Sequence, residues 1–115
     1  MALITFWHNP RCSKSRAALA MLEGRDVEVR RYLDDAPGEA ELRAAHAQLG
    51  GPVIAMMRTG EAAFRQAGLT KDSPEDALFA AMAAHPILIE RPLAMTAGRA
   101  VIGRPPEAVL ALLDR

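Results

Sequence analysis

Residues 2–33 read ALITFWHNPRCSKSRAALAMLEGRDVEVRRYL, and this stretch decides the fold. Its first part, ALITFW at 2–7, is apolar and β-branched and is broken at once by Asn9 and Pro10, which predicts a buried strand that runs into a loop. Its last part, VEVRRYL at 27–33, alternates and predicts a second strand.

Between these strands the sequence predicts a helix. Alanine, leucine and methionine dominate after Cys12, either Ser13 or Ser15 is a suitable cap, and Gly24 is a suitable end. Strand, helix and strand make a βαβ unit. Cys12 then lies between the carboxyl end of a strand and the amino end of a helix, where α/β folds usually bind ligands.

The rest of the chain completes a mixed sheet. Helix-forming segments fill about 37–88 and predict several short helices. Two strands follow at 91–96 and 99–103, joined by a tight turn, and a helix that begins with proline closes the chain at 105–113. We expect an α/β fold with helices on the faces of a mixed sheet and a helical insertion.

Composition narrows the class of protein. A length of 115 residues, with 50% hydrophobic and 24% charged residues, fits a single soluble domain over 1–115. Lys and Arg number 14, as do Asp and Glu, so net charge gives no reason to expect a nucleic acid partner. No apolar run is long enough for a membrane span. One cysteine and three histidines argue against an internal disulfide and a structural zinc site, and a free thiol suits the cytoplasm.

Cys12 is the candidate nucleophile. A reactive cysteine needs nearby positive charge or helix-terminal N–H groups, because the thiolate is the reactive form. The amides of residues 13–15 supply the helix-terminal N–H groups, and Arg11, Lys14 and Arg16 supply the positive charge. The alternative is that Cys12 is an inert, packed side chain. The polar flanks and the loop position favour reactivity.

Two self-contained thiol mechanisms do not fit. A CxxC dithiol would need cysteine at Ser15, and the C-x5-R phosphate loop would need arginine at Ala18. Redox turnover through Cys12 therefore requires a thiol from outside the chain.

The segment HNPRCSKSRAAL at 8–19 resembles the opening of the glutaredoxin-dependent arsenate reductase family. The resemblance covers nearly the whole chain, through YL at 32–33, MMRTGE at 56–61, HPILIERPL at 85–93 and GRPPEAVLALL at 103–113. It is closer to a short, uncharacterised branch of that family than to its longer resistance enzymes.

The resemblance implies a thioredoxin- or glutaredoxin-like sheet and a reaction that confers arsenic resistance. Cys12 attacks arsenate, glutathione as co-substrate converts the adduct to a mixed arsenic species, and the partner glutaredoxin completes reduction to arsenite. No bound cofactor or metal is implied, and we expect a monomer.

The resemblance also assigns site residues. His8 favours the Cys12 thiolate, or serves only as a structural imidazole. Ser15 supports the loop as a helix cap whose hydroxyl also donates to the thiolate. The predicted oxyanion ligands and the proline of an expected cis peptide are Arg58, Arg91, Arg104 and Pro92.

Other functions stay open. Relatives of the family include glutathione-dependent thiol oxidoreductases with other substrates. A regulator of the same fold binds RNA polymerase and senses oxidation through a CxxC pair, which Ser15 interrupts here. A degenerate scaffold with an unperturbed thiol is a further alternative.

Overall fold

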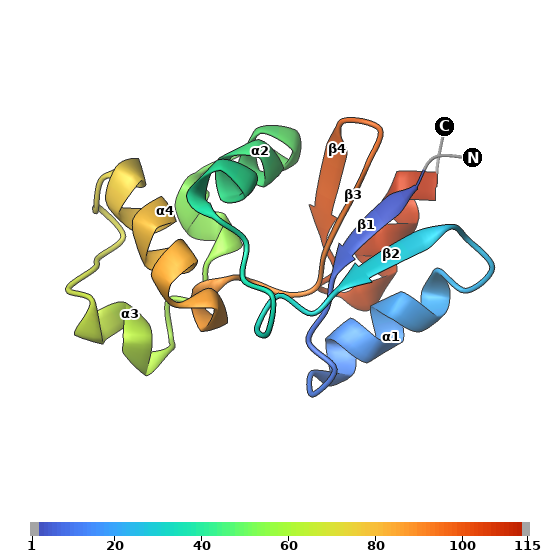
Figure 1. Ribbon diagram of the computed structural model, residues 1–115, viewed down its shortest axis with the longest axis horizontal. Coiled ribbons are helices and arrows are strands. Elements are labelled where there is room, and N and C mark those ends of the chain that lie inside the picture. Colours follow the sequence, from blue (N-terminus) through green and yellow to red (C-terminus); the bar gives the residue numbers. More distant parts are fainter. Residues whose placement is uncertain (1–2, 114–115) are drawn as a thin grey trace. The chain divides into compact units, whose positions relative to one another are not determined.

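The computed structural model describes residues 3–113 and places the four strands in one mixed sheet (Figure 1). In the order β2-β1-β3-β4 the strands are Val27–Arg30, Ile4–Trp7, Leu93–Thr96 and Arg99–Ile102. β1 is parallel to β2 and antiparallel to β3, and β3 and β4 form an antiparallel hairpin.

The strands are shorter than the sequence predicts. β3 begins at Leu93 rather than at 91, and β4 ends at Ile102 rather than at 103. β2 ends at Arg30 rather than at 33, because the Asp34 and Asp35 N–H groups donate to the Arg31 carbonyl and turn the chain. Residue 2, the predicted start of the first strand, lies outside the described residues.

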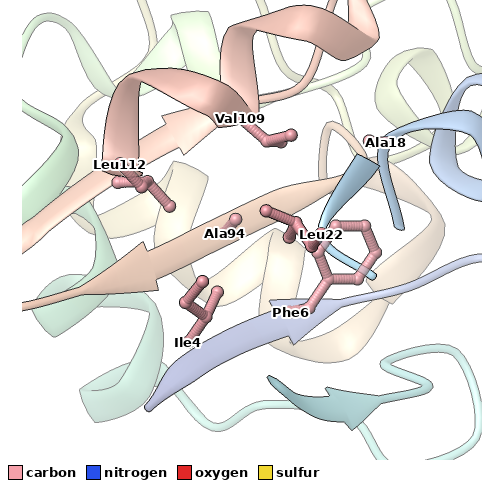
Figure 2. Close-up of a cluster of buried hydrophobic side chains, with 7 residues drawn as sticks. All are labelled: Ile4, Phe6, Ala18, Leu22, Ala94, Val109 and Leu112. Carbon is pink, nitrogen blue, oxygen red and sulfur yellow. The ribbon is translucent and has the colours of Figure 1, made fainter. Parts of the chain in front are cut away.

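One face of the sheet is covered by α1 (Ser13–Met21) and by η3 (Pro106–Leu113), which contact each other. Figure 2 shows the core between them. The sheet contributes Ile4, Phe6 and Ala94, α1 and its C-cap residue contribute Ala18 and Leu22, and η3 contributes Val109 and Leu112. Alternate residues of a strand share a face, so Ile4 and Phe6 both point into this core. The closing helix predicted at 105–113 is a 3-10 helix rather than an α-helix.

The chain divides into two compact units, one made of Met1–Asp35 with Arg91–Arg115 and one made of Ala36–Glu90. The first holds the sheet. The second contains the helices of the expected insertion, which are α2 (Glu39–Leu49), η1 (Val53–Met56), α3 (Ala62–Gln66), α4 (Glu75–Ala84) and η2 (Pro86–Leu88).

Side chains tie the second unit together. Arg43 on α2 bonds Asp76 on α4 at 2.8 Å and Glu39 at 3.4 Å, and its guanidinium lies 4.5 Å from the centre of the Phe79 ring. Met57 and Ile89 form an antiparallel bridge, which joins the segments that precede α3 and follow α4.

Candidate active site

Cys12 lies at the end of the loop that joins β1 to α1, as the sequence predicts. It is the N-cap residue of α1, with extended backbone angles of φ −95° and ψ 122°. Its N–H donates to the Asn9 carbonyl, and its carbonyl accepts the Arg16 N–H, both at 3.0 Å. The loop and the first helical turn therefore fix the backbone of this half-buried cysteine.

The surroundings lower the pKa of the Cys12 thiol below its ordinary value. Partial burial alone raises this pKa, because it disfavours the charged thiolate. The N–H groups of Ser15 and Lys14, which bond the sulfur, and the guanidinium of Arg91, which adds both its charge and a hydrogen bond, together outweigh this effect. The balance favours the nucleophilic form of the thiol.

Arg91 reaches Cys12 from the segment that leads into β3. It is partly buried, and its bond to Pro92 is the cis peptide that the family resemblance led us to expect. Pro92 is buried, and its carbonyl accepts the Gly103 N–H at 2.9 Å. The start of β3 thus presents Arg91 to the sulfur from a fixed backbone.

Gly103 is close-packed against this proline. A Cβ atom on Gly103 would lie 2.7 Å from Cγ of Pro92, which is too close for two carbon atoms. Arg104 follows and donates from Nη1 to the Arg91 carbonyl at 3.3 Å. A second cis peptide joins Arg104 to Pro105, which the sequence did not lead us to expect. Cys12, Arg91 and Arg104 thus belong to one compact unit.

His8 is buried next to Ser15 rather than placed as a cation beside the thiol. Its Nδ1 lies 2.7 Å from Oγ of Ser15. Burial lowers the pKa of His8, and the charges of Arg31 and Arg16 lower it further, so the neutral imidazole is favoured. This geometry gives His8 a route to Cys12 through Ser15, and the role predicted for it stays a prediction.

Ser15 does not cap the helix, which corrects the sequence interpretation. The N-cap is Cys12 and it makes no side-chain cap bond, whereas Ser15 lies in the first turn and is fully buried. Its Oγ accepts the Asn9 N–H at 3.1 Å and pairs with His8. Ser15 reaches the Cys12 sulfur with its backbone N–H, so it links the loop to the helix.

Arg58 belongs to the other unit, Ala36–Glu90. Its Nη1 donates to Glu61, its Nε lies 3.8 Å from Glu90, and its N–H donates to the Leu88 carbonyl at 2.7 Å. The guanidinium thus has two carboxylate neighbours. Its predicted part in oxyanion binding stays a prediction.

Some contributors to the site were not singled out from the sequence. Asn9 holds the loop with its side chain, because Oδ1 accepts the Arg11 N–H at 3.0 Å. An Asn-Pro pair before the cysteine is a usable signal for such a turn. Gly103 carries no comparable signal, since its need for a small side chain arises only from contact with Pro92.

Metal-binding and membrane-spanning features are absent from the described part of the chain, residues 3–113. It contains no group of three or more His, Cys, Asp or Glu side chains placed to hold a metal ion. None of its helices has the length and apolarity needed to cross a bilayer.

Known proteins resemble this chain over nearly its full length. An arsenate reductase of Neisseria meningitidis serogroup A is 44% identical, covering 98% of this chain and 100% of that one. The uncharacterized protein YfgD of Escherichia coli K12 is 40% identical, covering 96% of each chain. The solved structure of an arsenate reductase from Vibrio cholerae superposes with a TM-score of 0.91 at 46% identity, covering 96% of this chain and 97% of that one.

A family model also matches this chain. The model of the ArsC family matches residues 7–112. The structural match also confirms the expected thioredoxin-like α/β fold with a mixed sheet. The chain therefore belongs to the ArsC family.

Proposed function

We propose that this protein reduces arsenate to arsenite through the Cys12 thiolate, with glutathione as co-substrate and glutaredoxin as the final reductant. The observation that carries the proposal is the Cys12 sulfur bonded by the Ser15 and Lys14 amides and by Arg91. The nucleophilic sulfur thus lies among N–H donors that also suit an anion. The relatives from Neisseria meningitidis and Vibrio cholerae are named arsenate reductases.

The donors suit a tetrahedral oxyanion. Helix-terminal N–H groups bind anions, and guanidinium groups pair with their oxygens through two parallel hydrogen bonds. Arg91 already acts on the sulfur, and Arg104 bonds the Arg91 backbone. We assign both arginines to arsenate binding. Phosphate has the same shape and charge as arsenate, so selectivity between the two anions comes from the reaction of arsenic with sulfur.

The first step forms a bond between sulfur and arsenic. The Cys12 thiolate attacks arsenic(V), one As–O bond breaks, and that oxygen leaves as water after it takes up protons. Arsenic stays pentavalent in this adduct. A glutathione thiol then replaces a second oxygen, again with loss of water, and gives a mixed arsenic species.

The second phase transfers two electrons. A glutaredoxin thiolate attacks the glutathione sulfur and forms a mixed disulfide, and the electron pair of the broken S–As bond stays on arsenic, which becomes arsenic(III). Water then releases arsenite and restores Cys12. Two thiols from outside are needed because the sequence contains one cysteine.

The test is arsenite production by the pure protein with glutathione, glutaredoxin and NADPH-coupled glutathione reductase. We expect turnover above the protein-free blank, its loss in Cys12→Ser, and a strong reduction in Arg91→Ala. Arg65→Ala removes an exposed arginine of the other unit and serves as the matched control. A trace no faster than the blank, with an intact and acidic thiol, contradicts the proposal.

A second candidate is a glutathione-dependent thiol oxidoreductase with another substrate. It is favoured by the lowered pKa of Cys12, which by itself suffices for thiol exchange. Reduction of a glutathionylated peptide that requires Cys12, together with a flat arsenate assay, would select this function.

A further inference from the structure

One edge of the sheet is formed by β2, which pairs with β1 and with no other strand of residues 3–113 (Figure 1). The Ile4 N–H donates to the Asp26 carbonyl at 2.9 Å, and the His8 N–H donates to the Arg30 carbonyl at 2.8 Å. Successive residues of a strand turn their backbone groups to opposite sides. The N–H and carbonyl groups of Val27 and Val29 therefore point away from β1.

This edge is open to a further strand. Within the described chain, no hydrogen bond holds the outward backbone groups of Val27 and Val29. The Val29 side chain is 44% exposed, and Glu28 is exposed as well. A row of unbonded N–H and carbonyl groups at a sheet edge is a template for pairing with another chain.

The charges of β2 suit pairing with a second copy of itself. If two copies pair antiparallel about a two-fold axis at Val29, the two Val29 residues exchange both N–H···O bonds. Glu28 of one protomer then lies opposite Arg30 of its partner, and the reverse pair forms as well. Each such pair of opposite charges stabilises two strands by about 0.2–1 kcal/mol.

The other two-fold registers centred within β2 oppose like charges, which destabilises a strand pair. An axis at Val27 sets Asp26 opposite Glu28, and an axis at Arg30 sets two arginines opposite each other. An axis at Glu28 pairs Asp26 with Arg30 but brings the two Glu28 side chains directly together. The axis at Val29 alone opposes no like charges.

Arg30 is already ordered for this contact. Its guanidinium lies 5.9 Å from the centre of the Trp7 ring, and its Nε lies 3.3 Å from the Asp35 carboxylate. Trp7 is the register partner of Arg30 on β1, so this contact holds Arg30 on the sheet face that it shares with Glu28. Less side-chain entropy is therefore lost when Glu28 of the partner approaches.

We propose that β2 pairs antiparallel with β2 of a second copy of this chain, centred on Val29, and joins the two sheets into one. Strands of four residues bury far less than the roughly 1,200 Å² of a stable interface, so the dimer is weak and reversible. The resemblance led us to expect a monomer, and the open edge modifies that expectation. Because β1 runs parallel to β2, the two Cys12 loops lie at opposite ends of the joined strands.

The experiment traps the dimer through a cysteine placed on the axis. In the full-length chain with Cys12→Ser, Val29→Cys brings two thiols together across a pair whose Cα atoms lie about 5.5 Å apart, within the range of a disulfide. We expect oxidation to give a covalent dimer several-fold faster than Ala40→Cys, an exposed position on α2. Adding Glu28→Lys should slow trapping several-fold, because it sets two cations opposite each other.

A second variant tests the register. Glu28→Cys should trap more slowly than Val29→Cys, since Glu28 faces Arg30 of the partner rather than itself. Faster trapping by Glu28→Cys, or equal rates for Val29→Cys and Ala40→Cys, overturns the proposal.

The unmodified chain gives an independent reading. Amide chemical shifts of the ¹⁵N-labelled wild type should change with protein concentration at Val27, Val29 and Arg31, and not in α2. Shifts independent of concentration up to about 1 mM, beyond the range of even weak specific association, contradict a β2 dimer. No arsenate or thiol is present in either experiment, so the outcome is independent of the arsenite assay.

Discussion

At the scale of single residues, Cys12 is defined by a competition between burial and hydrogen bonding. Burial disfavours the thiolate, and two amides with one guanidinium favour it more strongly. Because the pKa is lower in the folded state, the thiolate's contribution to stability is present above the unfolded-state pKa and is lost as pH falls through the folded-state pKa.

Arg91→Ala removes one charge and one hydrogen bond from the thiolate. We expect the pKa of Cys12 to rise, and the rate of alkylation by iodoacetamide at pH 7 to fall, since less thiolate is present. Thiolate absorbance as a function of pH measures the first effect directly. An unchanged titration curve in Arg91→Ala would show that the two amides alone set this pKa.

Ser15→Ala tests the link between the loop and the helix. The change leaves the His8 imidazole and the Asn9 N–H without their hydroxyl partner, at a cost of about 1–3 kcal/mol for a buried polar group. Urea unfolding measures the loss. Ser13→Ala, at an exposed position two residues away, should change stability by less than about 0.5 kcal/mol.

At the scale of elements, the packing of Pro92 depends on a glycine, Gly103, directly after β4. Gly103→Ala places a Cβ 2.7 Å from Pro92, and such overpacking costs about 1–3 kcal/mol. We expect lower stability and altered Cys12 reactivity, because Arg91 precedes that proline. Gly60→Ala, where a Cβ meets no atom within 4 Å, is the control, and equal stability of the two variants would contradict this account.

The 3-10 helix η3 is longer than most helices of its type, which rarely exceed four residues. Arg99 stabilises its end, because Nη1 donates to the Ala111 carbonyl at 3.2 Å and Nη2 to the Leu112 carbonyl at 2.9 Å. Arg99→Ala should cost about 1–2 kcal/mol in urea unfolding. Amide exchange should accelerate in η3 and not in α2, and uniform acceleration would argue against a local cap.

At the scale of the whole molecule, a neutral chain separates its charges. The unit with the sheet has ten Lys or Arg against seven Asp or Glu, and Ala36–Glu90 has four against seven. Cys12 thus lies in the cationic unit. The net charge of the whole chain does not reveal this difference between the units, although an anionic substrate responds to the local charge around Cys12.

This separation predicts a salt effect on thiol chemistry. Iodoacetate is an anion and iodoacetamide is neutral, so the ratio of their alkylation rates at Cys12 reports local attraction. We expect the ratio to fall several-fold between about 20 mM and about 500 mM NaCl, as screening shortens the range of the field. A ratio independent of salt would show that the charges around Cys12 do not attract anions.

The sequence by itself determined the order of elements and the position of Cys12. Strand alternation, the Asn-Pro break and the helix-forming run at 13–22 act between near neighbours, so they are legible without a structure. For the same reason, the amides of Lys14 and Ser15 could be assigned to the sulfur in advance.

Only the tertiary structure decided which distant groups complete the site. Arg91 meets Cys12 because β3 pairs with β1, and Gly103 meets Pro92 because β4 pairs with β3. The sequence predicts Ser15 as a helix cap, since a serine hydroxyl suits that position, but in the structure this hydroxyl bonds the buried His8 and the Asn9 amide. Contacts of this kind depend on strand register and side-chain packing, which bring together residues that the sequence keeps apart.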